Sequence, residues 1–206
     1  MSMRIRTSAL TALAVAAVAA GTVLAAPAGA APKAAVPKFL SASQLPPHPT
    51  SSWTAEPVTE GFPEELGFCV STEGVLDYDY RHRTFRTDLD TGAVQLTVVT
   101  GTAAQAKALA KHYDDLIRTC ADRIEKASPD IEAESRDYGK LKVEEGAHVR
   151  GLHTETSFGA SDVDLLSVGR DGRTVTVLQW GQMGDFKDAP VTAFKKTTTT
   201  AVNKLY

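Results

Sequence analysis

Five residues in the C-terminal half of the chain have side chains suited to holding a small ligand. Trp180, Gln182 and Met183 lie in one short stretch that also carries two glycines. A large aromatic residue at a strand end, beside glycines that allow close approach, is typical of the wall of an apolar pocket. We therefore expect Trp180 and Met183 to line a cleft, with Gln182, His148 or His153 as polar contacts. The alternative is that Trp180 packs in the core beneath the last helix.

The two histidines do not predict a metal site. His148 and His153 are five residues apart, and this spacing on a strand places the two imidazoles on opposite faces of the sheet. A zinc site would need a bulge there and at least one further ligand from elsewhere. The chain also lacks the lysine and glycines of a phosphate-binding loop. We expect no metal and no cofactor.

One motif invites comparison with aspartic proteases. Asp90-Thr91-Gly92 follows Leu89 and occurs once, whereas those enzymes need two such carboxylates that share a proton. Asp-Thr-Gly is also an ordinary hairpin turn, in which Asp accepts backbone hydrogen bonds and Gly takes a positive φ. We interpret it as a turn.

No nucleophile is recognisable either. The G-x-S-x-G turn is absent, and although Ser157 and Ser161 lie near His153 and Asp162 in the sequence, such proximity does not indicate a triad. We expect a protein that is not an enzyme. A hydrolase whose catalytic groups escape recognition is the alternative.

The N-terminus predicts export. Arg4 and Arg6 precede an apolar run that ends in Ala28-Gly29-Ala30, which is the pattern of a secretory signal peptide over residues 1–30. No cysteine for lipidation lies near the cleavage point, and no later stretch is apolar enough to span a bilayer. We expect a secreted, extracellular protein that does not insert into the membrane after cleavage.

The amino-acid composition of the chain limits the classes of binding partner. The chain has 206 residues, 43% of them hydrophobic and 23% charged, as expected for one globular domain. Without the signal peptide, 20 basic residues face 25 acidic ones, so nucleic-acid binding has no electrostatic basis. Cys69 and Cys120 are the two cysteines, and in an oxidising compartment we expect them to form a disulfide. Two buried thiols are the alternative.

Hydrophobic periodicity predicts an α+β domain, an antiparallel sheet of about six strands flanked by two long helices. Hairpins are expected over residues 81–100, 131–157 and 163–181, the last with an Asp171-Gly172 turn. Helices are expected from Thr102 to Ser128, with a capping box and Cys120 on its apolar stripe, and from Asp188 onward. Residues 197–200, four threonines, are interpreted as a solvent-facing part of that last helix.

The remaining residues before this domain form a connecting segment. Residues 31–50 are rich in Ala and Pro, and we interpret them as a linker that ends in a docked N-terminal arm, with a helix-like patch over residues 39–45. A single domain then covers residues 51–206.

Several strings of the chain resemble one family. TDLDTGAVQLTVV, a helix carrying a cysteine, VEEGAHVRGLHT and WGQMGD, in this order, are similar to the PknH-like extracellular sensor domain of actinobacterial receptor kinases and related secreted proteins. The resemblance covers residues 39–206. It implies an antiparallel sheet flanked by helices and a cleft for an unidentified small ligand. The kinase's sensor domain has two disulfides, whereas this chain can form one, and the chain carries no kinase domain.

Together these observations predict a secreted, non-enzymatic sensor-type domain that binds an unidentified small molecule or cell-envelope ligand. A secreted hydrolase is one alternative. The other is an exported inhibitor or interaction protein that uses a loop such as residues 157–162.

Overall fold

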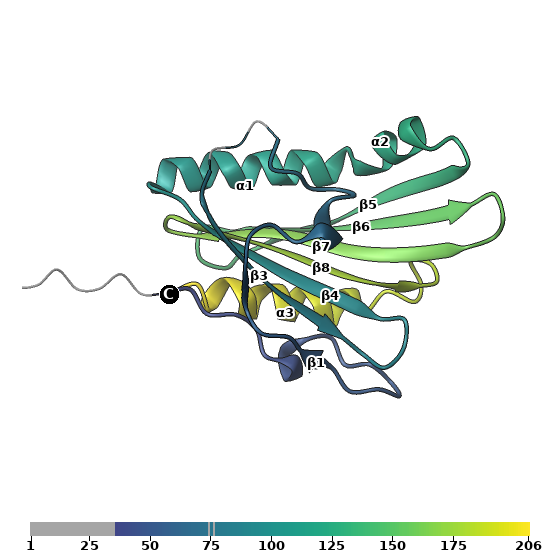
Figure 1. Ribbon diagram of the computed structural model, residues 1–206, viewed down its shortest axis with the longest axis horizontal. Coiled ribbons are helices and arrows are strands. Elements are labelled where there is room, and N and C mark those ends of the chain that lie inside the picture. Colours follow the sequence, from purple (N-terminus) through teal and green to yellow (C-terminus); the bar gives the residue numbers. More distant parts are fainter. Residues whose placement is uncertain (1–35, 74, 76) are drawn as a thin grey trace, which may run out of the picture. The chain divides into compact units, whose positions relative to one another are not determined.

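Eight strands form one antiparallel sheet with helices on both of its faces (Figure 1). The structure is a computed structural model that describes residues 36–73, 75 and 77–206. The predicted signal peptide and the first residues of the predicted linker lie outside the described residues. The strands are β1 (Thr54–Ala55), β2 (Thr59–Glu60), β3 (Asp79–Arg86), β4 (Gly92–Val99), β5 (Ile131–Leu141), β6 (Ala147–Thr156), β7 (Ser161–Asp171) and β8 (Thr174–Met183).

The sheet runs in the order β1-β3-β4-β8-β7-β6-β5, and β2 also pairs with β3. The six long strands are the predicted ones, and the predicted α+β class is confirmed. The two short strands escaped prediction because a strand of two residues has no measurable hydrophobic alternation.

The last hairpin turn differs from the prediction by one residue. Asp171 pairs with Thr174, so the two loop residues are Gly172 and Arg173 and not Asp171 and Gly172. Gly172 has φ +52°, and a glycine with positive φ in the first loop position is what one of the two favoured hairpin turns requires.

The predicted long helix is two helices. α1 (Ala103–Arg118) begins at its Thr102 cap, whose hydroxyl accepts a hydrogen bond from Gln105 N, and α2 (Cys120–Ala127) follows. Between them Thr119 has φ −102° and ψ 11°, and its hydroxyl donates to the Asp115 carbonyl at 3.0 Å. Such back-bonding by threonine competes with the helical hydrogen bonds and bends the helix.

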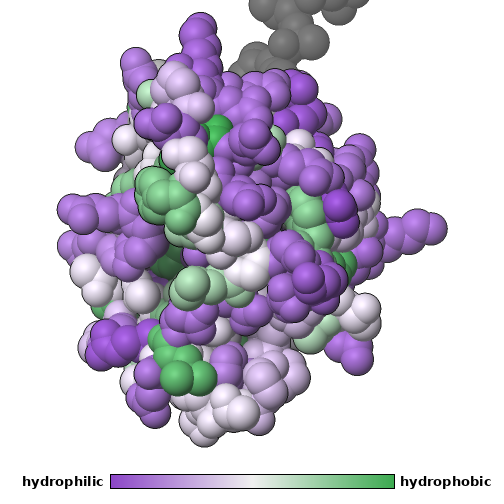
Figure 2. Space-filling model, turned by 90° about the vertical axis from the view of Figure 1, so that its right-hand side faces the viewer, coloured by the Kyte–Doolittle hydropathy of each residue, from purple (hydrophilic) through white to green (hydrophobic). Residues whose placement is uncertain are grey.

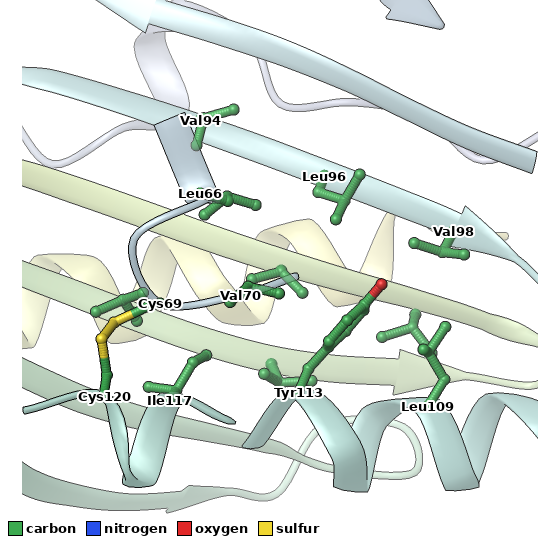
Figure 3. Packing of buried hydrophobic residues seen from close by; sticks show 14 of the residues in the cluster. Leu66, Cys69, Val70, Val94, Leu96, Val98, Leu109, Tyr113, Ile117 and Cys120 are labelled. Atoms are coloured by element: carbon green, nitrogen blue, oxygen red, sulfur yellow. A yellow bond between two sulfur atoms is a disulfide. The ribbon is translucent and has the colours of Figure 1, made fainter. Parts of the chain in front are cut away.

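Both helices pack on one face of the sheet, in an apolar cluster that has the disulfide at one end (Figure 3). Val94, Leu96 and Val98 of β4 point toward Tyr113 and other apolar residues of α1. Cys69 and Cys120 are bonded, as predicted, and span 51 residues of sequence. Closing a loop of this length stabilises the folded state by about 4 kcal/mol in the chain-entropy model. The bond joins the start of α2 to the segment after the short 3-10 turn η2 (Glu64–Leu66).

The opposite face is covered by α3 (Val191–Asn203) and the N-terminal arm. Leu40 and Leu45 of the arm flank the 3-10 turn η1 (Ala42–Gln44) and are buried. The buried Gln95 amide oxygen accepts a hydrogen bond from Leu40 N at 2.8 Å. The arm is therefore an integral part of the sheet's second layer.

The prediction that the four threonines of α3 face solvent is wrong for two of them. Thr197 and Thr198 are buried. Thr197 donates its hydroxyl hydrogen to the Gln44 carbonyl at 2.7 Å, and Thr198 shares a hydrogen bond of 2.9 Å with Ser167. One hydroxyl forms its hydrogen bond with the arm and the other with β7, so the polar groups on the inner face of the helix are satisfied.

Candidate functional site

A cleft of about 890 Å³ opens between α2 and one end of the sheet. The short helix α2 packs against β5 and β6, so the neighbouring ends of β7, β8, β4 and β3 remain open beneath it. Figure 2 looks onto the end of the sheet at the right of Figure 1, where hydrophobic patches lie between hydrophilic side chains. The residues that line the cleft on its sheet side include Thr84, Arg86, Gly92, Leu152, Thr154, Asp162, Asp164, Gln179, Gly181 and Gln182.

The floor of the cleft carries a carboxyl group. Asp164 of β7 accepts a hydrogen bond of 2.6 Å from the Gln179 side-chain amide of β8. Burial raises the pKa of Asp164 to about 6, the Gln179 hydrogen bond opposes this shift, and the charge of Asp162 adds to it. Perturbed carboxyl groups in clefts are typical of functional sites.

A glycine makes room for this pair. Gly181 lies opposite Asp164 across the β7–β8 ladder. A Cβ at Gly181 would come within 2.4 Å of Asp164 Oδ1 and 2.8 Å of Gln179 Nε2. The Asp164–Gln179 pair therefore depends on a missing side chain in the next strand.

The walls of the cleft are apolar and are held by the disulfide. Phe68 and Ile124 line the cleft from the η2 segment and from α2, and Leu152 lines it from β6. Phe68 precedes Cys69, while Ile124 lies one turn after Cys120. Because these cysteines are bonded, the two walls are fixed to each other.

The stretch that contains Trp180 is divided between two faces. Trp180 is 3% exposed and belongs to the core cluster beneath α3, on the face opposite the cleft. The structure thus matches the alternative interpretation of this residue. Gln182 lines the cleft and lies near Thr91, with 3.4 Å between the side-chain oxygens. Met183 ends β8 with 62% of its surface exposed.

His148 lies outside this cleft, in a polar cluster beneath α1. Its Nδ1 is 3.1 Å from Asp114 Oδ1 and its Nε2 is 2.8 Å from Asp137 Oδ1. Arg150, which is buried, donates from Nε and Nη2 to the two oxygens of Asp114 at 2.8 and 3.1 Å. Burial alone would raise the pKa of Asp114, but the Arg150 hydrogen bonds and the His148 charge outweigh it and the pKa is lowered. This cluster anchors α1 to β6.

His153 lies on the other face of β6, so the structure does not bring the two histidines together. Its Nε2 is 2.9 Å from Ser161 Oγ, and Ser161 donates its own hydroxyl hydrogen to the Gly184 carbonyl at 3.0 Å. When Ser161 donates to Gly184, the hydrogen bond to the ring takes its proton from His153 Nε2. In the part of the chain that the structure describes, no carboxylate forms a hydrogen bond with the ring.

Asp164 is the residue that the sequence analysis overlooked. A signal was present, because Asp164 is in phase with Leu166 and Val168, which face the core. A carboxylate on the buried side of a central strand is rare unless it is paired or functional.

Neither a metal centre nor a membrane-spanning helix is found among the residues that the structure describes. Within residues 36–73, 75 and 77–206, no three His, Cys, Asp or Glu side chains lie close enough to hold a metal ion. No helix in these ranges is long and apolar enough to cross a bilayer.

No family model, curated protein or solved structure matches the chain.

Proposed function

We propose that this protein is a secreted, non-enzymatic ligand-binding domain of the PknH-like sensor type and that the cleft beneath α2 holds its small-molecule ligand. The observation that carries the proposal is the cleft itself. Its volume of about 890 Å³ falls within the range of small-molecule sites, and its apolar walls with a few convergent polar groups are what such sites contain.

The rigidity of the cleft supports a binding role. Its floor is built on paired strands, and its walls are joined by the Cys69–Cys120 bond. A preformed site loses little conformational freedom on binding, so less of the interaction energy is spent on ordering the protein.

Two further features support the family and the location. The fold class that the resemblance implies, an antiparallel sheet flanked by helices, is the class observed. A disulfide in a domain of this size is typical of proteins exported to an oxidising compartment.

A thermal-shift screen with cleft-blocking variants tests this function. The mature chain is screened against cell-wall fragments, lipids and nucleotides, because a ligand that binds the folded state raises its melting temperature. Thr154→Trp places a bulky ring in the cleft from β6, and Glu155→Trp adds the same ring to an exposed neighbouring position. A shift that is lost in the first variant and kept in the second supports the proposal. A shift that both variants keep places the ligand elsewhere and contradicts it.

A second pair of variants guards against misfolding of Thr154→Trp. Ala127→Trp approaches the cleft from α2, where Ala127 is exposed and lines the cleft, and Lys126→Trp is its exposed control. The two blocking variants should give the same result.

The contact between His153 and Ser161 favours a second candidate, a hydrolase with a serine nucleophile. The Gly184 carbonyl, 3.0 Å from the Ser161 hydroxyl, competes with the ring for the hydroxyl hydrogen. A fluorophosphonate probe decides the matter: labelling of Ser161 that is lost in His153→Ala would establish a reactive serine. We expect no labelling.

The third candidate, an interaction protein, is favoured by Phe158. It lies in the β6–β7 turn with 82% of its surface exposed. If Phe158→Ser abolished every binding event while the blocking variants changed none, this loop and not the cleft would be the functional surface.

A further inference from the structure

We infer that the ligand of this cleft is an organic cation, in which an ammonium or guanidinium group is joined to an apolar group. This inference rests on the proposed binding function and names the chemical class of the ligand. It depends on the charge balance of the cleft, on the hydrogen bonding of Asp164 and on the position of the apolar walls.

The charged side chains that line the cleft are unbalanced. They are Glu65, Asp90, Asp162, Asp164, Arg86 and Arg123. Arg86 already forms an ion pair with Glu56, which is outside the cleft lining, and Arg123 donates to the backbone carbonyls of Cys69 and Leu116. Among the residues that the structure describes, neither arginine forms an ion pair with the four carboxyl groups, and acidic side chains outnumber basic ones in the lining, which favours a ligand of positive charge.

Asp164 has the capacity to bind such a group directly. Its Oδ1 accepts from Gln179, whereas its Oδ2 accepts no hydrogen bond from any residue in the described part of the chain, and no basic side chain there forms an ion pair with it. Asp164 is partly buried, and withdrawing a carboxylate from water with one neutral partner is costly. An ammonium group at this position would supply both the missing donor and the missing charge.

The pKa of Asp164 also favours a cation as its partner. Burial raises this pKa to about 6, which means that the ionised form is disfavoured unless a positive charge lies beside it. A cation bound beside the carboxyl group would stabilise the ionised form and lower the pKa, so binding should strengthen as the pH rises through about 6.

The walls fit the other half of the ligand. Phe68, Ile124 and Leu152 line the same cleft as Asp164, and Phe68 keeps 39% of its surface exposed. An aromatic side chain with a free surface can contact an apolar chain, and its face can also attract a cation. An organic cation is favoured over a metal ion because the described residues offer no group of three metal ligands.

Three probes with one skeleton test the inference. Phenylbutylamine, phenylbutanol and phenylbutyrate carry a positive, a neutral and a negative group on the same apolar chain, and their affinities are measured by calorimetric titration at about pH 8, where Asp164 is ionised. We expect the amine to bind at least tenfold more tightly than the alcohol, with phenylbutyrate the weakest. We expect the preference for the amine to decrease as the pH falls through about 6.

Matched variants assign the effect to one carboxyl group. Asp164→Asn should lower the affinity for the amine about tenfold and leave the affinity for the alcohol unchanged, because it removes the charge and keeps an acceptor for Gln179. Asp122→Asn removes an exposed charge from α2 outside the cleft lining and should leave all three affinities unchanged.

The outcomes separate this inference from the function beneath it. If the alcohol or phenylbutyrate binds as tightly as the amine, and this binding is lost in Thr154→Trp, the cation inference is wrong and the binding function stands. If the amine does not bind at all, the inference is also wrong, and the function is then decided by the screen described above. If Asp122→Asn and Asp164→Asn lowered the affinity for the amine equally, the preference for the amine would come from long-range electrostatic attraction. That result would contradict a direct contact with Asp164.

Discussion

Replacing Asp164 by Asn should make the protein more stable at neutral pH when no ligand is added. Asn keeps the side-chain oxygen that accepts the 2.6 Å hydrogen bond from Gln179, and it removes the charge that burial disfavours. The raised pKa means that the folded state binds the Asp164 proton more tightly than the unfolded chain does. The protein therefore loses stability as the pH rises between the two pKa values, and Asn removes this loss.

The size of the effect follows from the shift. Between the ordinary value of 3.8 and about 6, each pKa unit corresponds to about 1.4 kcal/mol. The gain from Asp164→Asn should therefore approach about 3 kcal/mol at neutral pH and fall to about 0.5 kcal/mol near pH 4, where Asp164 is largely protonated in the folded state. Water that reaches the cleft reduces the first figure, so a gain of 1 to 3 kcal/mol is expected, roughly.

Urea unfolding at the two pH values measures this difference. The midpoint of Asp164→Asn should exceed that of the wild type at neutral pH and approach it near pH 4, with an unchanged dependence on urea. Asp122→Asn, which alters an exposed carboxylate, should show no such dependence on pH. A loss of stability in Asp164→Asn at neutral pH, or a gain of equal size at both pH values, would refute the account of a strained carboxyl group.

Three further changes test the structure around the cleft. Replacing both cysteines by alanine should lower the free energy of unfolding by about 4 kcal/mol in urea titrations. It should also lower the affinity for any ligand of the cleft, because the two walls are no longer joined. Gly181→Ala should displace Asp164, since the new Cβ would come within 2.4 Å of its Oδ1; we expect a cost of about 1 to 3 kcal/mol by thermal unfolding. Asp114→Asn should cost about 2 kcal/mol or more because it leaves Arg150 buried with a weaker partner. Because the pKa of Asp114 is lowered, its stabilisation is complete above its ordinary pKa of 3.8 and is lost as the pH falls below it, so the variant and wild type should converge in acid unfolding experiments.

Much of the fold was predictable because hydrophobic alternation and helical periodicity report which side of an element is buried. The stripe that contains Leu109 and Tyr113 predicted the helix and the face that it presents to the sheet. The break at Thr119 and the burial of Thr198 were not predictable, since each depends on a hydrogen bond whose partner is chosen by the folded structure.

The site was harder to predict than the fold. Trp180 and Gln179 are neighbours on β8 and face opposite sides of the sheet, so the position of the pocket depends on which face the helices leave uncovered. The shortness of α2 leaves the face of Gln179 and Asp164 open, whereas α3 covers Trp180. The alternation of β8 can be read from its sequence. How far the helices extend over the sheet cannot, because it depends on the folded structure.

Chemical-shift mapping by two-dimensional NMR tests the central claim most directly. A hit from the screen is titrated into the labelled protein, and the backbone signals that move are assigned to residues. We expect the largest changes at Thr154, Asp164, Gln179 and Gly181, which line the cleft, with small changes around Trp180. Changes that gather on the α3 face, or on the exposed turn around Phe158, would contradict a binding site beneath α2.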